Sequence, residues 1–268
     1  RSFRSSSFFG IHEKIEFLNM EDTVTGVLTV EGDEIFLKGE SGKTYLKSVH
    51  IWDGYVTHWK DHAVHARYLP QKDYENGKHI FILWPVKEKE SVPFLELYYN
   101  ERLVKYTASS FGHNAINICG DIFNFSHLMN ENEILTPEEY FYRPALGEFA
   151  PSPITGRFVL NENGRNFMRT IHVLRIEEID ETFLSHIFHE ELKVIHNTKP
   201  HPKNPEKYKD FNFLTRSCTT ILRDGLRKYG FKKIKGVFPR DFFISAVTIC
   251  LSIKGLKTTL FALPQLLV

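Results

Sequence analysis

The chain has 268 residues, 42% apolar and 25% charged, which is the composition of a globular protein with one large domain or two ordinary ones. A formal net charge of +1 excludes a whole-chain argument for nucleic-acid binding. Three cysteines without a Cys-x-x-Cys pair exclude a disulfide scaffold and a cysteine-rich metal site, so we expect neither a metal nor a cofactor.

The first part of the chain predicts a flexible arm followed by a small β-domain. Residues 1–21 begin with a run of Arg and Ser that is typical of an arm. Between residues 22 and 90, alternating apolar positions and turn residues predict five short strands, which favour a small barrel similar to the OB type. Aromatic and histidine side chains between Trp52 and His65 are expected to close this barrel, to pack on a neighbouring domain or to form a ligand surface.

Residues 91–268 predict a second domain of mixed α and β elements, which the chain enters after a charged stretch that ends at Pro93. A hairpin is expected around Gly120-Asp121, and a strand over 170–175. Apolar residues at helical spacing predict a helix from about Asp180 to His196. The fold class is therefore α+β.

The apolar C-terminal segment 242–268 is interrupted by Lys254, Lys257 and Pro264 before it reaches the length that spans a bilayer. We expect it to form a packed helix, with peripheral membrane contact as the alternative. The sequence therefore predicts no transmembrane span.

Cys218 is the cysteine whose surroundings suit catalysis, because polar residues precede it and a helix is expected to begin there. Ser217 or Thr215 would cap that helix and Gly230 would end it. A helix N-terminus stabilises a thiolate, so the position predicts a lowered pKa for the Cys218 thiol. Cys119 and Cys250 lie in apolar patterns, where cysteine is typically a small buried residue.

A thiol nucleophile needs a histidine, and His113 is the best placed because it begins a predicted strand directly after Gly112. The imidazole in turn needs an orienting partner. A two-residue turn at Gly120-Asp121 places Asn124 on the same face as His113, whereas a three-residue turn places His127 opposite His113. We favour Asn124 and keep His127 as the alternative.

Three segments carry a family resemblance: Ser-Ser-Phe-Gly-His-Asn-Ala-Ile-Asn-Ile at 109–118, Asp-Ile-Phe-Asn-Phe-Ser at 121–126, and Tyr-Lys-Asp-Phe-Asn-Phe-Leu-Thr-Arg-Ser-Cys-Thr-Thr-Ile-Leu-Arg-Asp at 208–224. They resemble the bacterial Lnb amino-terminal periplasmic domain family, which is similar to the circularly permuted NlpC-type branch of papain-like cysteine enzymes. The resemblance covers about residues 94 to 245. Ser217 departs from it, since the family usually has Asn at that position.

The resemblance implies a permuted papain-like α+β domain over 91–268 with Cys218 as nucleophile, His113 as general base and Asn124 as the third residue. It also implies a protein of the bacterial cell envelope or periplasm, or a secreted one. His127 is similar to the second-strand histidine of the acyltransferase members of the same branch.

The expected function is a cysteine hydrolase that forms an acyl-enzyme, acting on an amide bond of a peptide, glycopeptide or cell-wall peptide. The first alternative is a lipid-directed acyltransferase or esterase. The second is a non-catalytic binding module, because the segment 199–240 holds twelve Lys or Arg and three acidic residues and can form an anion-binding surface.

Overall fold

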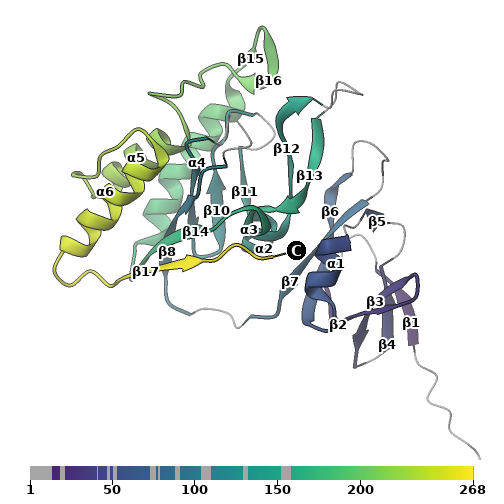
Figure 1. Cartoon of the computed structure of the whole chain (residues 1–268). Helices are drawn as coiled ribbons and strands as arrows, with labels where there is room; N and C mark the ends of the chain where they lie inside the picture. Colours follow the sequence, from purple (N-terminus) through teal and green to yellow (C-terminus); the bar gives the residue numbers. More distant parts are fainter. Residues whose placement is uncertain are drawn as a thin grey trace, which may run out of the picture. The chain divides into compact units, whose positions relative to one another are not determined.

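The computed structural model describes residues 14–18, 22–40, 42–46, 49–50, 53–72, 77, 79–87, 91–103, 110–128, 132–151 and 158–267. The chain divides into two compact units, Arg1–Lys87 and Glu88–Val268, each of which is described by itself (Figure 1). Helices and antiparallel sheets are mixed along the chain, so the α+β class predicted from the sequence is confirmed.

The first unit holds one sheet whose strands follow the order β1-β4-β3-β2-β6-β7-β5. Leu28, Phe36 and Val64 are fully buried in it, as the alternating pattern predicts. The elements are β1 (Lys14–Phe17), β2 (Val24–Glu31), β3 (Glu34–Gly39), β4 (Gly42–Tyr45), β5 (Val49–His50), α1 (Asp53–Trp59), β6 (Ala63–Lys72) and β7 (His79–Pro85). Among the described strands, β1 and β5 end the ladder without pairing to each other, so an OB-like barrel stays a prediction.

Two expectations for this unit, the flexible arm and the aromatic ligand surface, can be compared with the structure. Strand β1 lies inside the segment predicted as an arm, of which residues 1–13 and 19–21 are outside the described part. Tyr55 and Trp59 are 3% and 5% exposed, and the Tyr55 hydroxyl donates to the Leu83 carbonyl at 3.0 Å. These two aromatic side chains therefore pack in the core rather than form a ligand surface, whereas Trp52 lies outside the described residues.

The second unit is built on an antiparallel six-stranded sheet in the order β11-β10-β9-β8-β14-β17. Its strands are β8 (Phe94–Asn100), β9 (His113–Ile118), β10 (Asp121–Asn124), β11 (Glu133–Leu135), β14 (Ile171–Glu177) and β17 (Thr258–Leu263). Two smaller hairpins accompany it, β12 (Pro144–Pro151) with β13 (Phe158–Gly164) and β15 (Pro200–His201) with β16 (Asn204–Tyr208). The strand predicted over 170–175 is confirmed as β14.

Helices α4 (Glu181–Asn197), α5 (Cys218–Tyr229) and α6 (Pro239–Ser252) cover one face of this sheet (Figure 1). Their apolar residues form a core with Leu97 and Ile116. The short helices α2 (Pro137–Tyr142) and α3 (Arg165–Met168) belong to the other face, since the ring of Tyr98 stacks on that of Tyr140 at 5.5 Å and successive strand residues alternate between faces. The helix predicted from Asp180 is confirmed, with the Asp180 carboxylate accepting from the Phe183 amide at 3.0 Å.

The C-terminal segment differs from the prediction of one packed helix. Helix α6 ends at Ser252, the chain turns through Gly255 at φ 84°, and residues 258–263 return as the edge strand β17. Leu260 pairs with Leu174 of β14, so backbone pairing across the sheet overrides the apolar run that favoured a longer helix. Within the described residues, no helix is long and apolar enough to cross a membrane.

Candidate functional site

His113 takes its position from the glycine before it. Gly112 has φ 84°, and a Cβ on it would lie 2.6 Å from the Asn100 carbonyl oxygen and 2.8 Å from the Tyr99 ring. Only glycine combines this left-handed backbone with so close an approach to β8. The chain therefore enters β9 tightly against β8, with His113 as the first strand residue opposite Asn100.

The β9–β10 hairpin turns one residue earlier than predicted. Cys119 and Gly120 form the turn at φ 52° and 109°, and Asn117 pairs with Ile122 rather than with Asn124. This register differs from the predicted one by two residues, which leaves every side chain on its predicted face. Asn124 therefore still shares a face with His113.

The hydrogen bond that the sequence favoured is present. His113 Nε2 lies 2.8 Å from Asn124 Oδ1, and the Asn124 side chain is only 1% exposed. Because an amide oxygen only accepts, Nε2 donates its hydrogen and Nδ1 keeps the lone pair. The His127 ring packs on Phe211 with centroids 5.6 Å apart, and its charge acts on His113 only as a smaller influence on the His113 pKa.

Burial, followed by the charge of the Arg165 guanidinium, lowers the pKa of His113 to about 3. The hydrogen bond from His113 to Asn124 opposes that shift without reversing it. The imidazole is therefore neutral at pH 7, with its lone pair at Nδ1, and its low pKa makes it a weak base. Sequence reasoning missed Arg165, which lies in α3 with its guanidinium 4.7 Å from the Tyr140 ring centre.

Helix α5 begins at Cys218, as predicted. Of the two proposed caps, Ser217 is the one observed: its hydroxyl accepts from the Thr220 amide at 3.4 Å and its amide donates to the Thr220 hydroxyl at 2.8 Å. This reciprocal capping box fixes where the helix starts, and Gly230 at φ 142° ends it. The thiol is thereby held on the first turn of α5.

The half-buried Cys218 thiol lies against the start of β9. The backbone amides of Asn114 and Thr219 hydrogen-bond to its charged form and favour the thiolate. Burial outweighs them, however, and raises the pKa of Cys218 above its ordinary value. The prediction of a lowered thiol pKa is therefore wrong in this conformation, because desolvation is larger than the helix N-terminal effect.

Hydrogen bonds tie the Cys218 turn to the histidine strand. The Thr219 hydroxyl donates to Asn114 Oδ1 at 3.0 Å, and Asn114 Nδ2 donates to the Tyr98 carbonyl at 3.0 Å. Asn114 directly follows His113 in β9. Cys218 and His113, the candidate catalytic residues, therefore both lie at the beginning of this strand.

The thiol lies beside the start of β9, but on the other face of the sheet from the imidazole. Asn114 faces α5, and strand alternation therefore turns His113 toward the opposite face, where α2 lies. No hydrogen bond among the described residues joins Sγ of Cys218 to the His113 ring. The thiol nevertheless acts electrostatically on the Tyr140 hydroxyl of α2, where a thiolate raises the tyrosine pKa. Proton transfer therefore requires a side-chain rotation or an intervening water.

The other two cysteines lack such a setting. Cys250 is 1% exposed and burial raises its pKa to about 12. Burial also raises the pKa of Cys119, whose sulfur accepts from the Phe94 amide at 3.3 Å in the β9–β10 turn. Within the described ranges, no group of three His, Cys, Asp or Glu side chains is placed to hold a metal ion.

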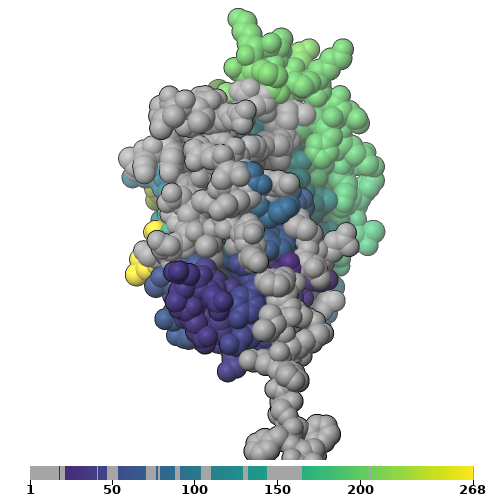
Figure 2. Space-filling view, turned by 90° about the vertical axis from the view of Figure 1, so that its right-hand side faces the viewer, coloured from purple at the N-terminus to yellow at the C-terminus, as the bar shows by residue number. Residues whose placement is uncertain are grey.

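The basic segment 199–240 is partly neutralised by neighbouring acids. Glu191 pairs with Arg216 at 3.2 Å and with Lys228 at 3.4 Å. Asp224 pairs with Arg223 at 2.8 Å. The segment starts in the β15–β16 hairpin, which projects from the surface of the second unit (Figure 2).

Comparisons with known proteins give no match to this chain among family models, curated proteins or solved structures. The family resemblance therefore stays a prediction. What can be said of the site follows from its own geometry: a neutral thiol at a helix start beside a strand whose first residue is a neutral, amide-oriented imidazole.

Proposed function

We propose that the second unit is a cysteine hydrolase in which Cys218 is the nucleophile, His113 the general base and Asn124 the residue that orients the imidazole. One observation carries the proposal: Asn124 Oδ1 accepts from His113 Nε2 at 2.8 Å while the thiol lies against the amide of the next residue, Asn114. This bond leaves Nδ1 as the basic nitrogen, which is what a thiol nucleophile needs from its partner.

The reaction starts from a neutral pair. As Sγ of Cys218 attacks the carbonyl carbon of an amide, Nδ1 of His113 takes the thiol proton through an intervening water or after a side-chain rotation, and the C=O π electrons move to the oxygen. The N–H groups of Cys218 and Thr219, at the start of α5, have no acceptor within the helix and stabilise that oxyanion. The imidazolium then protonates the leaving nitrogen as the C–N bond breaks, which leaves an acyl-enzyme. After the amine leaves, His113 deprotonates a water that attacks the thioester carbonyl; the C–S bond then breaks, the acid is released, and the imidazolium returns the proton to Sγ.

The wider family proposal is supported by the order of the elements. The histidine strand β9 precedes the cysteine helix α5 and the helix packs on the sheet that contains the strand, which fits a permuted papain-like domain of NlpC type. This hypothesis implies that the substrate is an amide bond of a peptide or cell-wall peptide. It also implies a protein of the cell envelope or periplasm, or a secreted one. We also propose that the first unit is an OB-like barrel domain.

The test uses a peptidyl acyloxymethyl ketone, a weak electrophile that alkylates a thiol efficiently only when a base assists it. We expect mass spectrometry to find the adduct on Cys218, with Cys119 and Cys250 as unmodified internal controls. His113→Gln should slow the reaction while the protein stays folded. Equal rates of Cys218 alkylation in the parent and in His113→Gln would show that His113 is not the general base and would refute the proposal.

A lipid-directed acyltransferase or esterase is the second candidate, and exposed apolar side chains beside the site favour it. Phe111 is 49% exposed, Phe213 40% and Leu214 57%, and the Phe111 and Phe213 rings are 5.2 Å apart. Side-by-side hydrolysis of a peptide amide and of a phospholipid ester separates the two candidates. A binding module instead predicts that Cys218→Ala keeps the full biological activity of the parent.

A further inference from the structure

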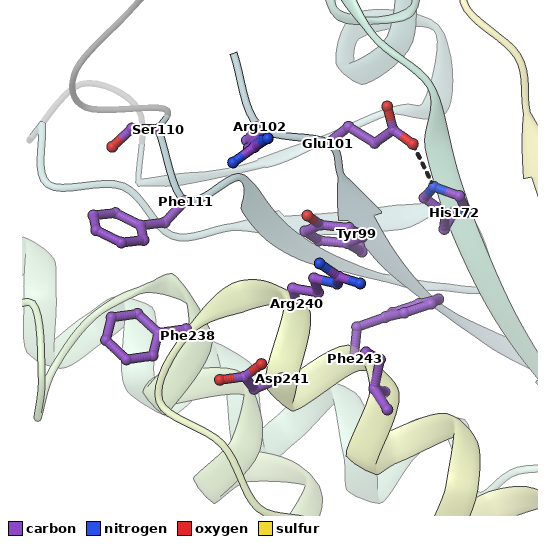
Figure 3. A pocket seen from close by; sticks show the side chains of 11 residues that line it. Tyr99, Glu101, Arg102, Ser110, Phe111, His172, Phe238, Arg240, Asp241 and Phe243 are labelled. Carbon is purple, nitrogen blue, oxygen red and sulfur yellow. Dashed lines mark hydrogen bonds and ion pairs between the residues drawn. The ribbon is translucent and has the colours of Figure 1, made fainter. Parts of the chain in front are cut away.

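A pocket of about 730 Å³ opens on the α6 side of the sheet in the second unit (Figure 3). Its floor comes from β8 and β14, one wall from the first turns of α6, and the other wall from the loop before β9. Its lining includes four aromatic residues and two arginines: Tyr99, Phe111, Phe238, Phe243, Arg102 and Arg240.

Aromatic rings form two opposing sides of the pocket. Tyr99 lies 5.8 Å from Phe243 between ring centres, and Phe111 stacks on Phe238 at 5.4 Å and 27°. Figure 3 shows these two groups apart, with the open space between them. A flat apolar group fits between such surfaces, since aromatic pairs gain from offset or edge-to-face contact beyond their buried area.

Two guanidinium groups, of Arg102 and Arg240, reach into the same space, and Figure 3 shows both beside Tyr99. Their charges act on the Tyr99 hydroxyl, since each lowers the Tyr99 pKa against the larger opposing effect of burial. Over the described ranges, neither arginine forms an ion pair. They are therefore available to an external anion.

The two carboxylates of the pocket limit which anion fits. Glu101 is engaged by His172, with Oε1 2.7 Å from Nε2. Asp241 lies in the first turn of α6, where a negative charge suits the helix dipole. The two acids already balance the two arginines, so each further negative charge on a ligand is disfavoured, and a carboxylate with one charge fits better than a phosphate dianion; a carboxylate also matches the planar two-point geometry that arginine favours.

We propose that this pocket binds an aromatic carboxylate, with the ring between the two aromatic sides and the carboxylate on Arg102 and Arg240. Two sources supply this chemistry: the C-terminal aromatic residue of a peptide, and a free aromatic acid. The pocket lining does not include Cys218, His113 or Asn124, and the pocket is tested in Cys218→Ala, so that binding is measured whether or not the thiol is catalytic.

The experiment is calorimetric titration of the full chain carrying Cys218→Ala with N-acetylphenylalanine and with its C-terminal amide. The acid should bind at least tenfold more tightly than the amide. Arg240→Gln and Arg102→Gln should each weaken acid binding by tenfold or more. The matched control is Lys232→Gln, which removes one exposed positive charge that does not line the pocket, and it should leave the affinity unchanged.

A second set of ligands distinguishes the sources. Acetyl-glycyl-phenylalanine that binds more tightly than N-acetylphenylalanine identifies a peptide C-terminus, and equal binding of the two identifies the free acid; both results support the site. Phenyl phosphate should bind more weakly than either. Equal affinity for acid and amide, an equal loss in Lys232→Gln, or the absence of binding overturns the proposal.

Discussion

Asn124→Ala is the substitution that probes the orienting role most directly, because it removes the acceptor of the His113 Nε2–H bond and nothing of the nucleophile. The bond is 2.8 Å long and the Asn124 side chain is 1% exposed. Loss of the partner of a buried polar group costs about 1–3 kcal/mol. If the whole of that cost falls on correct placement of the imidazole, the rate falls by roughly 5- to 150-fold.

The assay is the second-order rate constant for alkylation of Cys218 by the acyloxymethyl ketone, measured beside the urea midpoint of each variant. Asn117→Ala is the matched control: it removes another buried asparagine of the hairpin, one that bonds Tyr98 and the Gly120 amide but does not touch His113. Asn117→Ala should lower stability and spare the rate. Equal rate losses in both variants would show that Asn124 acts only through folding, and an unchanged rate in Asn124→Ala would refute the orienting role.

Three further predictions concern stability and pH. Gly225→Ala should lower the free energy of unfolding by about 1–3 kcal/mol in urea titration, since its Cβ would lie 2.4 Å from the Phe188 ring. Thr219→Val should cost about 0.5–1.5 kcal/mol and slow Cys218 alkylation, because it frees the first turn of α5 from Asn114. The folded-state pKa of His113, about 3, lies below its ordinary value, so its contribution to stability is present above about pH 6.5 and is lost as the pH falls toward 3; His113→Gln should flatten that part of the stability curve.

Much of the hairpin and helix that carry the site could be predicted because local chemistry determines them. The Ser217 cap, the Gly230 end and the apolar spacing of α5 act within one helix, and the parity of a two-residue turn places Asn124 on the face of His113 wherever the turn starts. The exact position of the turn could not be predicted, because Cys119 adopts φ 52°, a backbone conformation that residues with a side chain do not favour.

The features that could not be predicted from the sequence depend on residues that are far apart in the chain. The balance between the helix N-terminus and burial at Cys218 depends on what packs around the thiol, which no local pattern records. Arg165 acts on His113 from a separate short helix. The pocket brings together loop residues near 102 and 111 with the start of α6, and β17 forms from a segment whose apolar run alone favoured a helix.

For the proposed cysteine hydrolase, the electrostatics of the site favour a neutral thiol and imidazole before the reaction over a preformed ion pair. A preformed thiolate–imidazolium pair would place two charges where burial disfavours both, since burial raises the Cys218 pKa and lowers that of His113. A neutral pair avoids this cost and postpones charge separation until the thiol attacks, when the oxyanion and the N–H groups of α5 share the negative charge. The imidazolium formed at that moment is strongly acidic, because its pKa is low. An acid of this kind suits protonation of an amide nitrogen, which leaves poorly as an anion. In the proposed mechanism, the depressed pKa that makes His113 a weak base therefore makes its protonated form an effective acid for the step in which the C–N bond of the amide breaks.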